Sequence, residues 1–287
     1  MSSAVVSTSA ARGRPFVFDI EEDVAEVCAQ PSGAELFGEA RPPQRVISTD
    51  ARLVGVTPAS RLAVRPAPEM VSSGIAAMDA LTGGLPRGCL TEVCGPPSSG
   101  RTTLLLAALA AATRRGEFCA VVDASDALDP QSAAAVGVEL DRLLWVRCGE
   151  NSPQKCLEQL LRATDLLLES GGFGLIALDL GDLPQQAARH IPLTTWFRFR
   201  RAVEHTSTVL LAIERQSIAG SCSSLLIKLG SQGYRIKESG IPKLPALSHA
   251  QLLTELEISA EILRSRMERK PVRSTEITFA SRTAWAG

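Results

Sequence analysis

The stretch that decides the fold of this chain reads Gly95-Pro96-Pro97-Ser98-Ser99-Gly100-Arg101-Thr102-Thr103. Its spacing matches the phosphate-binding pattern G-x-x-x-x-G-K-[ST], except that arginine stands in place of the lysine. The apolar run 90–94 before it predicts a buried strand, and the alanine- and leucine-rich run 102–112 after it predicts a helix. Such a strand, loop and helix N-terminus form an anion site, because backbone N–H groups and the helix dipole point at one spot.

Arg101 keeps the positive charge of the missing lysine but changes its shape. A lysine ammonium is a compact point charge, whereas a guanidinium is planar, bulkier and forked. The guanidinium can hold a phosphate, even with two hydrogen bonds, but phosphoryl transfer depends on accurate positioning. We therefore expect the loop to bind nucleotide and to turn it over slowly. The alternative is a tight turn that binds nothing.

The composition excludes several classes of protein. With 287 residues, of which 45% are hydrophobic and 21% charged, the chain has the make-up of one large or two modest globular domains. Its net charge of −1 gives no general attraction for nucleic acid, so any DNA contact has to be local. The seven cysteines contain no C-x-x-C pair and the three histidines are far apart, so no metal-binding spacing is present.

We expect a cytoplasmic protein without a membrane partner. Scattered cysteines, odd in number, suit a reducing compartment. Residues 1–14 are rich in serine and alanine and have no apolar segment of the kind a signal peptide contains. No apolar run of the sequence is long enough to span a membrane.

The sequence predicts three regions, which are an N-terminal segment at 1–70, a core at 71–240 and a C-terminal extension at 241–287. Within the first region, residues 1–15 are expected to be disordered. Residues 16–40 are acidic with interleaved apolar side chains, which indicates either a solvated tail or a segment that docks on a partner. Residues 41–69 are rich in arginine and proline and predict a linker.

From residue 71 onward, predicted strands alternate with predicted helices. We expect strands at 118–123, 143–146, 173–179 and 208–214. We expect helices at 74–81, 130–136, 153–170 and 192–205. The remaining expectations are a hairpin of 225–228 with 233–237, a helix near 248–265 and a strand at 277–280. The alternation predicts an α/β fold with a mostly parallel twisted sheet flanked by helices, a short extended N-terminal segment and a small C-terminal helix and strand.

Four motifs resemble, in order, the core of the RecA family of bacterial recombinases. They are Ser72–Asp79, Gly84–Gly88, Gly95–Thr103 and Val122–Pro130. The resemblance extends over residues 71–237 and implies a RecA-like P-loop NTPase core that binds ATP with Mg²⁺.

The resemblance also implies roles for single residues. Nucleotide contacts fall on Gly95, Pro96, Pro97, Ser98, Ser99, Gly100, Arg101, Thr102 and Thr103. Thr102 and Asp179 become the residues associated with Mg²⁺, and Asp129 the one that meets the base. RecA proteins have a glutamate that activates water where this chain has Ser125, which is too weak a base for that work, so we assign no catalytic residue. Ser132 replaces the tyrosine that stacks on adenine.

In the RecA family two loops contact DNA, and they correspond here to the short segments 181–195 and 215–223. The N-Q pair that relays between DNA and ATP is replaced by Glu214-Arg215. One patch combines arginine with an aromatic ring, which suits phosphate contact and base stacking, and consists of Arg189, Trp196, Arg198, Arg200 and Arg201. The alternative is a buried helix face, because Trp196 and Phe199 are three residues apart on a predicted helix.

A RecA-like core with altered ATPase residues and short DNA loops is similar to the ImuA-type proteins, which are accessory factors of damage-induced mutagenesis. The resemblance implies a DNA repair and SOS-response protein that binds ATP and single-stranded DNA with weak or no hydrolysis. The expected partners are a RecA filament or translesion polymerase subunits, or further copies of the chain in a homo-oligomer. Two alternatives stay open, which are a DNA-dependent ATPase that performs strand exchange and a non-catalytic interaction module.

Overall fold

The computed structural model describes residues 3–4, 16–19, 67–148, 152–236, 253–266, 276–282 and 284–285. The disorder predicted for 1–15, the acidic segment predicted for 16–40 and the linker predicted for 41–69 lie almost wholly outside these residues. The helices and strands belong to one compact unit, which residues 1–22 and 68–287 form.

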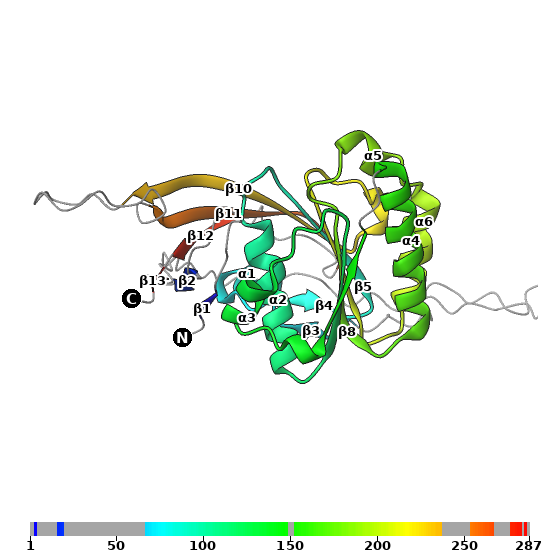
Figure 1. Ribbon diagram of the computed structural model, residues 1–287, viewed down its shortest axis with the longest axis horizontal. Helices are drawn as coiled ribbons and strands as arrows, with labels where there is room; N and C mark the ends of the chain where they lie inside the picture. Colours follow the sequence, from blue (N-terminus) through cyan, green and yellow to red (C-terminus); the bar gives the residue numbers. More distant parts are fainter. Residues whose placement is uncertain are drawn as a thin grey trace, which may run out of the picture. The chain divides into compact units, whose positions relative to one another are not determined.

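An eight-stranded sheet forms the centre of this unit (Figure 1), with strands β5 (Cys89–Cys94), β6 (Phe118–Asp123), β7 (Leu143–Arg147), β8 (Phe173–Asp179), β9 (Val209–Glu214), β10 (Leu225–Ile236), β11 (Leu253–Ser265) and β12 (Glu276–Arg282). Six neighbours, in the order β10-β5-β9-β8-β6-β7, run parallel. Strands β11 and β12 extend the β10 edge and pair antiparallel. The predicted α/β class with a mostly parallel sheet is thus confirmed.

Helices cover both faces of the sheet (Figure 1). One face carries α1 (Ala76–Thr82), α2 (Arg101–Arg114) and α3 (Pro130–Ala135), and the other α4 (Pro153–Ser170), α5 (Gln185–Arg189) and α6 (Leu193–Val203). Successive strand residues point to opposite faces, so Val121 joins the core of the α2 side while Ala120 and Val122 join that of the α4 side. Burial on both faces explains the continuous apolar runs of these strands. Among the described helices, none has the length and apolarity that a membrane crossing needs.

The core is built mainly from aliphatic side chains, as the 4% of aromatic residues requires. Every residue of α2 from Thr103 to Thr113 is buried, and its many alanines let the helix lie close to the sheet. On the opposite face Trp196 and Phe199 of α6 are fully buried, with their ring centroids 6.0 Å apart in an edge-to-face arrangement. This pair is the kind of aromatic contact that adds specific geometry to a core.

Several short elements complete the described chain. Strands β3 (Met70–Val71) and β4 (Leu85–Pro86) form an antiparallel pair next to α1. A three-stranded sheet consists of β1 (Ser3–Ala4), β2 (Phe16–Asp19) and β13 (Ala284–Trp285). Two single 3-10 turns are η3 (Leu140–Arg142) and η4 (Gly220–Cys222).

The predicted helix near 248–265 is wrong over 253–265, where the chain forms strand β11. Ile258 and Ala260 are fully buried and belong to the core on the α2 side of the sheet. Their spacing of two residues is that of side chains on one face of a strand. The predicted strand at 277–280 is confirmed as part of β12.

The predicted hairpin within 225–237 is also wrong, because β10 runs without a turn from Leu225 to Ile236. Strand β11 pairs with it along its whole length. Where a turn was expected, the register shifts between Ser231 and Gly233, which is a bulge in a continuous strand. The glycines of this segment allow either a turn or a continuous strand, and pairing with β11 selects the strand.

Gly74 lets the chain pass close to α2 just before α1 begins. Its φ is +85°, and a Cβ at this position would lie 2.3 Å from the carbonyl oxygen of Ala107. The segment is fixed by Asp79, whose carboxylate accepts hydrogen bonds from the backbone N–H of Ser73 at 2.8 Å and from its hydroxyl at 2.6 Å. Only glycine meets both the backbone angle and the close approach.

We predict that Gly74→Ala destabilises the fold more than Gly116→Ala does. Gly116 has a φ of +82° but no atom within 4 Å of its Cβ position, so its replacement costs only the left-handed backbone strain, about 1–2 kcal/mol. At Gly74 the collision with a backbone oxygen adds about 1–3 kcal/mol. Urea unfolding of the two variants measures the difference, and equal losses would contradict the proposed close approach.

Candidate nucleotide-phosphate site

The glycine-rich loop joins the carboxyl end of β5 to the N-terminus of α2. The backbone N–H of Gly95 donates to the carbonyl oxygen of Glu214, at the end of β9, over 3.1 Å. A Cβ on Gly95 would lie 2.6 Å from the carbonyl oxygen of Leu229, so the β10 backbone leaves no room for a side chain. Gly100 precedes the helix with a φ of +90° and no side-chain cap, which leaves the first-turn N–H groups available to an anion.

The nine loop residues differ in exposure. Pro96, Pro97, Ser98 and Thr102 are exposed, whereas Gly95, Ser99, Gly100 and Thr103 are buried and Arg101 is half-buried. Ser98 adopts a left-handed φ of +61°, which turns the chain at the exposed tip. The loop thus has the open tip and buried base that a phosphate cradle needs.

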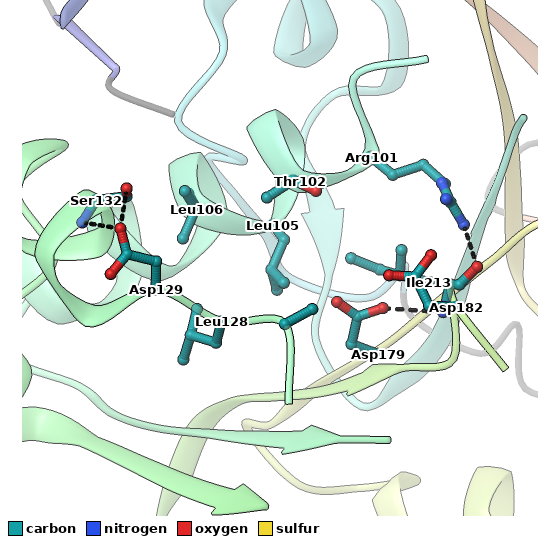
Figure 2. Close-up of a pocket in the computed structure, with 12 residues that line it drawn as sticks. Arg101, Thr102, Leu105, Leu106, Leu128, Asp129, Ser132, Asp179, Asp182 and Ile213 are labelled. Atoms are coloured by element: carbon teal, nitrogen blue, oxygen red, sulfur yellow. Dashed lines mark hydrogen bonds between the residues drawn. The ribbon is translucent and has the colours of Figure 1, made fainter. Parts of the chain in front are cut away.

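A pocket lies beside the loop, between the first turns of α2 and the carboxyl ends of β8 and β9 (Figure 2). Its lining consists of Arg101, Thr102, Leu105, Leu106, Ala127, Leu128, Asp129, Ser132, Asp179, Gly181, Asp182 and Ile213. The pocket therefore brings together four residues that the sequence singled out separately, which are Arg101, Thr102, Asp129 and Asp179. Parallel strands make this possible, because their carboxyl ends meet at one edge of the sheet.

Arg101 points away from Thr102 and across to the segment that follows β8 (Figure 2). Its Nη1 donates to the carbonyl oxygen of Gly181 at 3.2 Å. Burial lowers the pKa of the guanidinium from its usual value, while the nearby carboxylates of Asp179 and Asp182 raise it. A guanidinium stays charged under all ordinary conditions, so the side chain bridges helix and sheet as a cation.

Asp179 ends strand β8 at the bottom of the pocket. Burial raises its pKa to about 6, against a hydrogen bond from the backbone N–H of Gly181 that favours the charged form. The bond to Asp179 Oδ1 measures 2.9 Å. Asp123 on the neighbouring strand raises the pKa further, and Arg101 lowers it. The carboxylate that the resemblance pairs with Mg²⁺ is thus already held by the protein's own groups.

Asp129 caps helix α3. Its carboxylate accepts hydrogen bonds from the backbone N–H groups of Gln131 and Ser132, each at 3.2 Å, and from the Ser132 hydroxyl. This is the standard role of an aspartate at a helix start. Asp129 lines the pocket, and its contact with a base stays a prediction. Ser132 is buried in the capping arrangement and offers no ring for stacking.

Ser125 lies exposed in the segment after β6, and its backbone N–H donates to the buried carboxylate of Asp123 at 3.0 Å. The adjacent carboxylate, Asp126, has a left-handed φ of +56° and forms a two-point ion pair with Arg147. Asp123 itself accepts from Leu128 N–H at 2.9 Å and from the indole of Trp145 at 3.2 Å. The carboxylates near Ser125 are therefore engaged in holding this segment.

The structure does not gather the predicted arginine and aromatic patch on one surface, because it buries the ring and leaves most of the arginines exposed. Trp196 is fully buried, so the buried-face alternative applies to it and its ring offers no surface to a base. Arg198 is exposed but bonded to both carboxylate oxygens of Asp165, at 2.9 and 2.7 Å. Arg189 donates to the Gln216 side chain at 2.7 Å.

The outer side of α6 presents another aromatic ring. Phe197 is 48% exposed. Arg201 follows one turn later and is exposed, and Arg200 beside it is half-buried. Residues four apart on a helix are neighbours, so Phe197 and Arg201 share one surface. The sequence pattern does not distinguish Trp196 from Phe197. Packing buries the first ring and leaves the second exposed.

The segment 215–223, which the resemblance relates to a DNA loop, packs onto the sheet. Ala219 and Cys222 are fully buried. The backbone N–H groups of Ile218 and Ala219 donate to Glu92 Oε1 at 2.6 and 3.0 Å. A carboxylate within β5 thus fixes the segment that leaves β9, next to the phosphate loop.

Glu92 and Glu214 are functional candidates that sequence reasoning missed as a pair. They lie on the neighbouring strands β5 and β9 and are almost fully buried. Burial raises the pKa of Glu214 well above its ordinary value, and the negative charge of Glu92 adds to this. The available signal was a lone carboxylate within each of two otherwise apolar strands.

The residues do not fit Mg²⁺ in the way the resemblance implies. Thr102 and Asp179 line the same pocket, but a guanidinium reaches the carboxylate side of it. Within the ranges that the structure describes, no three His, Cys, Asp or Glu side chains are grouped to hold a metal ion. A guanidinium therefore lies on the side of the pocket where the resemblance places a divalent ion.

Comparison with known proteins matches part of this chain to one family. Residues 60–183 match the family described as RecA N-terminal domain. Over 113 residues the chain is 44% identical to Protein RecA of Ectopseudomonas oleovorans, which covers 39% of this chain and 31% of that protein. It is 42% identical over 118 residues to Protein RecA of Kineococcus radiotolerans, which covers 40% of this chain and 32% of that protein. The RecA resemblance is thus confirmed for this segment.

The chain spans about a third of the length of these curated relatives. A crystal structure of the RadB recombinase superposes with a TM-score of 0.49 and 17% identity, covering 73% of this chain and 94% of that chain. The match to the RecA N-terminal domain family, over residues 60–183, includes the phosphate loop and Asp179. The narrower similarity to ImuA-type proteins stays a prediction.

We predict that Glu214→Gln flattens the pH dependence of stability. The folded chain holds a proton on Glu214 that the unfolded chain releases near the ordinary pKa of 4.5. The free energy of unfolding of the native protein therefore falls as the pH rises above 4.5 toward the raised pKa of Glu214 in the folded chain. Glutamine cannot lose a proton, so the fall is smaller in the variant.

Urea unfolding at several pH values measures this effect, with Glu158→Gln as the control. Glu158 is an exposed glutamate on α4, and its replacement should leave the pH dependence of the native protein. An unchanged pH dependence in Glu214→Gln would mean that Glu214 is ionised in the folded protein.

Proposed function

We propose that this chain is a RecA-related accessory factor of damage-induced mutagenesis, active in the cytoplasmic SOS response. It binds ATP through residues 95–103 and contacts single-stranded DNA and protein partners without efficient hydrolysis. The observation that carries this proposal is a phosphate-type loop that leads into the N-terminus of α2, next to a segment with Ser125 in place of the water-activating glutamate.

The arrangement around Ser125 supports weak hydrolysis. General-base catalysis requires a group that accepts a proton near the attacking water, and a serine hydroxyl does this poorly. The neighbouring Asp126 is bound to Arg147, and Asp123 is buried beneath three donors. Neither carboxylate is positioned as a substitute.

The packing of 215–223 favours an accessory role over strand exchange. A segment that couples DNA to nucleotide has to move, whereas this one is buried at Ala219 and Cys222 and fixed to Glu92. DNA contact then falls to the outer surface of α6. As partners we propose a RecA filament or translesion polymerase subunits, with self-association as a further possibility.

We predict no ATP turnover above background, with or without single-stranded DNA. The reason is the absence of a positioned base rather than a loss of binding. Phosphate release by the full chain is compared with that by Arg101→Glu, which places a negative charge at the phosphate site. Turnover that single-stranded DNA stimulates would favour the recombinase alternative and would mean that another residue replaces Ser125.

We predict that Arg200→Ala combined with Arg201→Ala weakens binding to a single-stranded oligonucleotide. Two phosphate contacts fewer reduce the slope of log affinity against log salt by about 1.4. Fluorescence anisotropy over a range of salt concentrations measures both effects. Arg198→Ala is the matched control, because Arg198 is already neutralised by Asp165. An equal effect of the control, or an unchanged slope in the double variant, would exclude this surface of α6 as the contact with single-stranded DNA.

A further inference from the structure

Arg101 is placed to act as a permanent cation at the site. It is the first residue of α2, and its side chain crosses the pocket to Gly181 rather than following the loop (Figure 2). Asp179 lies at the same point, because a Cβ on Gly181 would be 2.7 Å from Arg101 Nη1 and 3.0 Å from Asp179 Oδ1. The guanidinium and the carboxylate thus flank one small volume.

A second arginine completes the charge balance. Arg215 Nε donates to the same Gly181 carbonyl at 2.8 Å, and its Nη2 lies 3.5 Å from Asp182 Oδ1. Two guanidinium groups, Arg101 and Arg215, therefore face two carboxylates, Asp179 and Asp182. Arg215 thus pairs with Asp182, and Arg101 is the guanidinium that acts on Asp179.

Arg101 also retains hydrogen-bonding capacity toward the pocket. A guanidinium has five N–H donors in a planar fork, and the contact with Gly181 uses one nitrogen. Arginine is well suited to phosphate oxygens, since the fork can bond two of them at once. The half-buried group can therefore hold its carbonyl partner and meet a phosphate chain on its open side.

We propose that Arg101 takes the charge-compensating place of the divalent cation, so that this site binds nucleoside polyphosphates without Mg²⁺. This inference rests on the ATP binding proposed above and narrows it. A divalent ion next to Asp179 would meet the positive charge of Arg101, whereas a phosphate chain would meet the guanidinium and the N-terminus of α2 together. The divalent ion and Arg101 would thus both serve to compensate the negative charge of the phosphates at this site.

The test is equilibrium binding of the fluorescent nucleotide mant-ATP to the full chain, in excess magnesium chloride and in EDTA. We expect the two dissociation constants to agree within about threefold. A loss of affinity of more than about tenfold in EDTA would overturn this inference and leave the proposed ATP binding intact. No binding under either condition would overturn the proposed ATP binding as well.

Arg101→Lys tests the residue itself. An ammonium group is a compact charge without the fork that reaches carbonyl and phosphate together, so this variant should lose at least about tenfold in affinity when Mg²⁺ is removed. Arg114→Lys is the matched control, because Arg114 lies at the far end of the same helix, where its Nε donates to Ala110. Unfolding curves of both variants verify that they fold. Magnesium-independent binding by Arg101→Lys would overturn the role of Arg101.

Discussion

The parallel pairing of β5 with β9 is the constraint on which the rest of the site depends. It brings the Gly95 N–H to the Glu214 carbonyl and so fixes where the phosphate loop begins. The backbone of β10 on the other side approaches so closely that only glycine fits at position 95. With both neighbours fixed, the loop has one path into α2, and the helix N-terminus points at the carboxyl edge of the sheet.

The arginine in the loop changes the electrostatics of this edge. Arg101 carries the same single positive charge as a lysine, but its guanidinium reaches the Gly181 carbonyl, close to Asp179 and Asp182. The same substitution joins α2 to the end of β8 through Gly181. The site is therefore more tightly connected within the protein, which suits binding better than the repeated rearrangements of turnover.

Carboxylates fix several segments around the site. Asp123 holds the segment after β6, Glu92 holds the segment after β9, and Asp129 caps α3. Each fixes a segment near the pocket by accepting hydrogen bonds from backbone N–H groups, and Asp123 and Glu92 do so from buried positions. The outer side of α6, where Phe197 and Arg201 are exposed, is the surface that we propose for DNA contact.

The sequence by itself determined the phosphate loop, its strand and helix, and the parallel order of strands and helices, because these depend on local spacing and on apolar periodicity. It also located Thr102, Asp129 and Asp179, which the parallel sheet then gathered in one pocket. Tertiary structure decided what local patterns left open. Pairing with β10 made 253–265 a strand, and packing buried Trp196 and exposed Phe197. Arg101 reaches the carbonyl oxygen of Gly181, which is 80 residues away along the chain. Such contacts are non-local, so no window of sequence contains them.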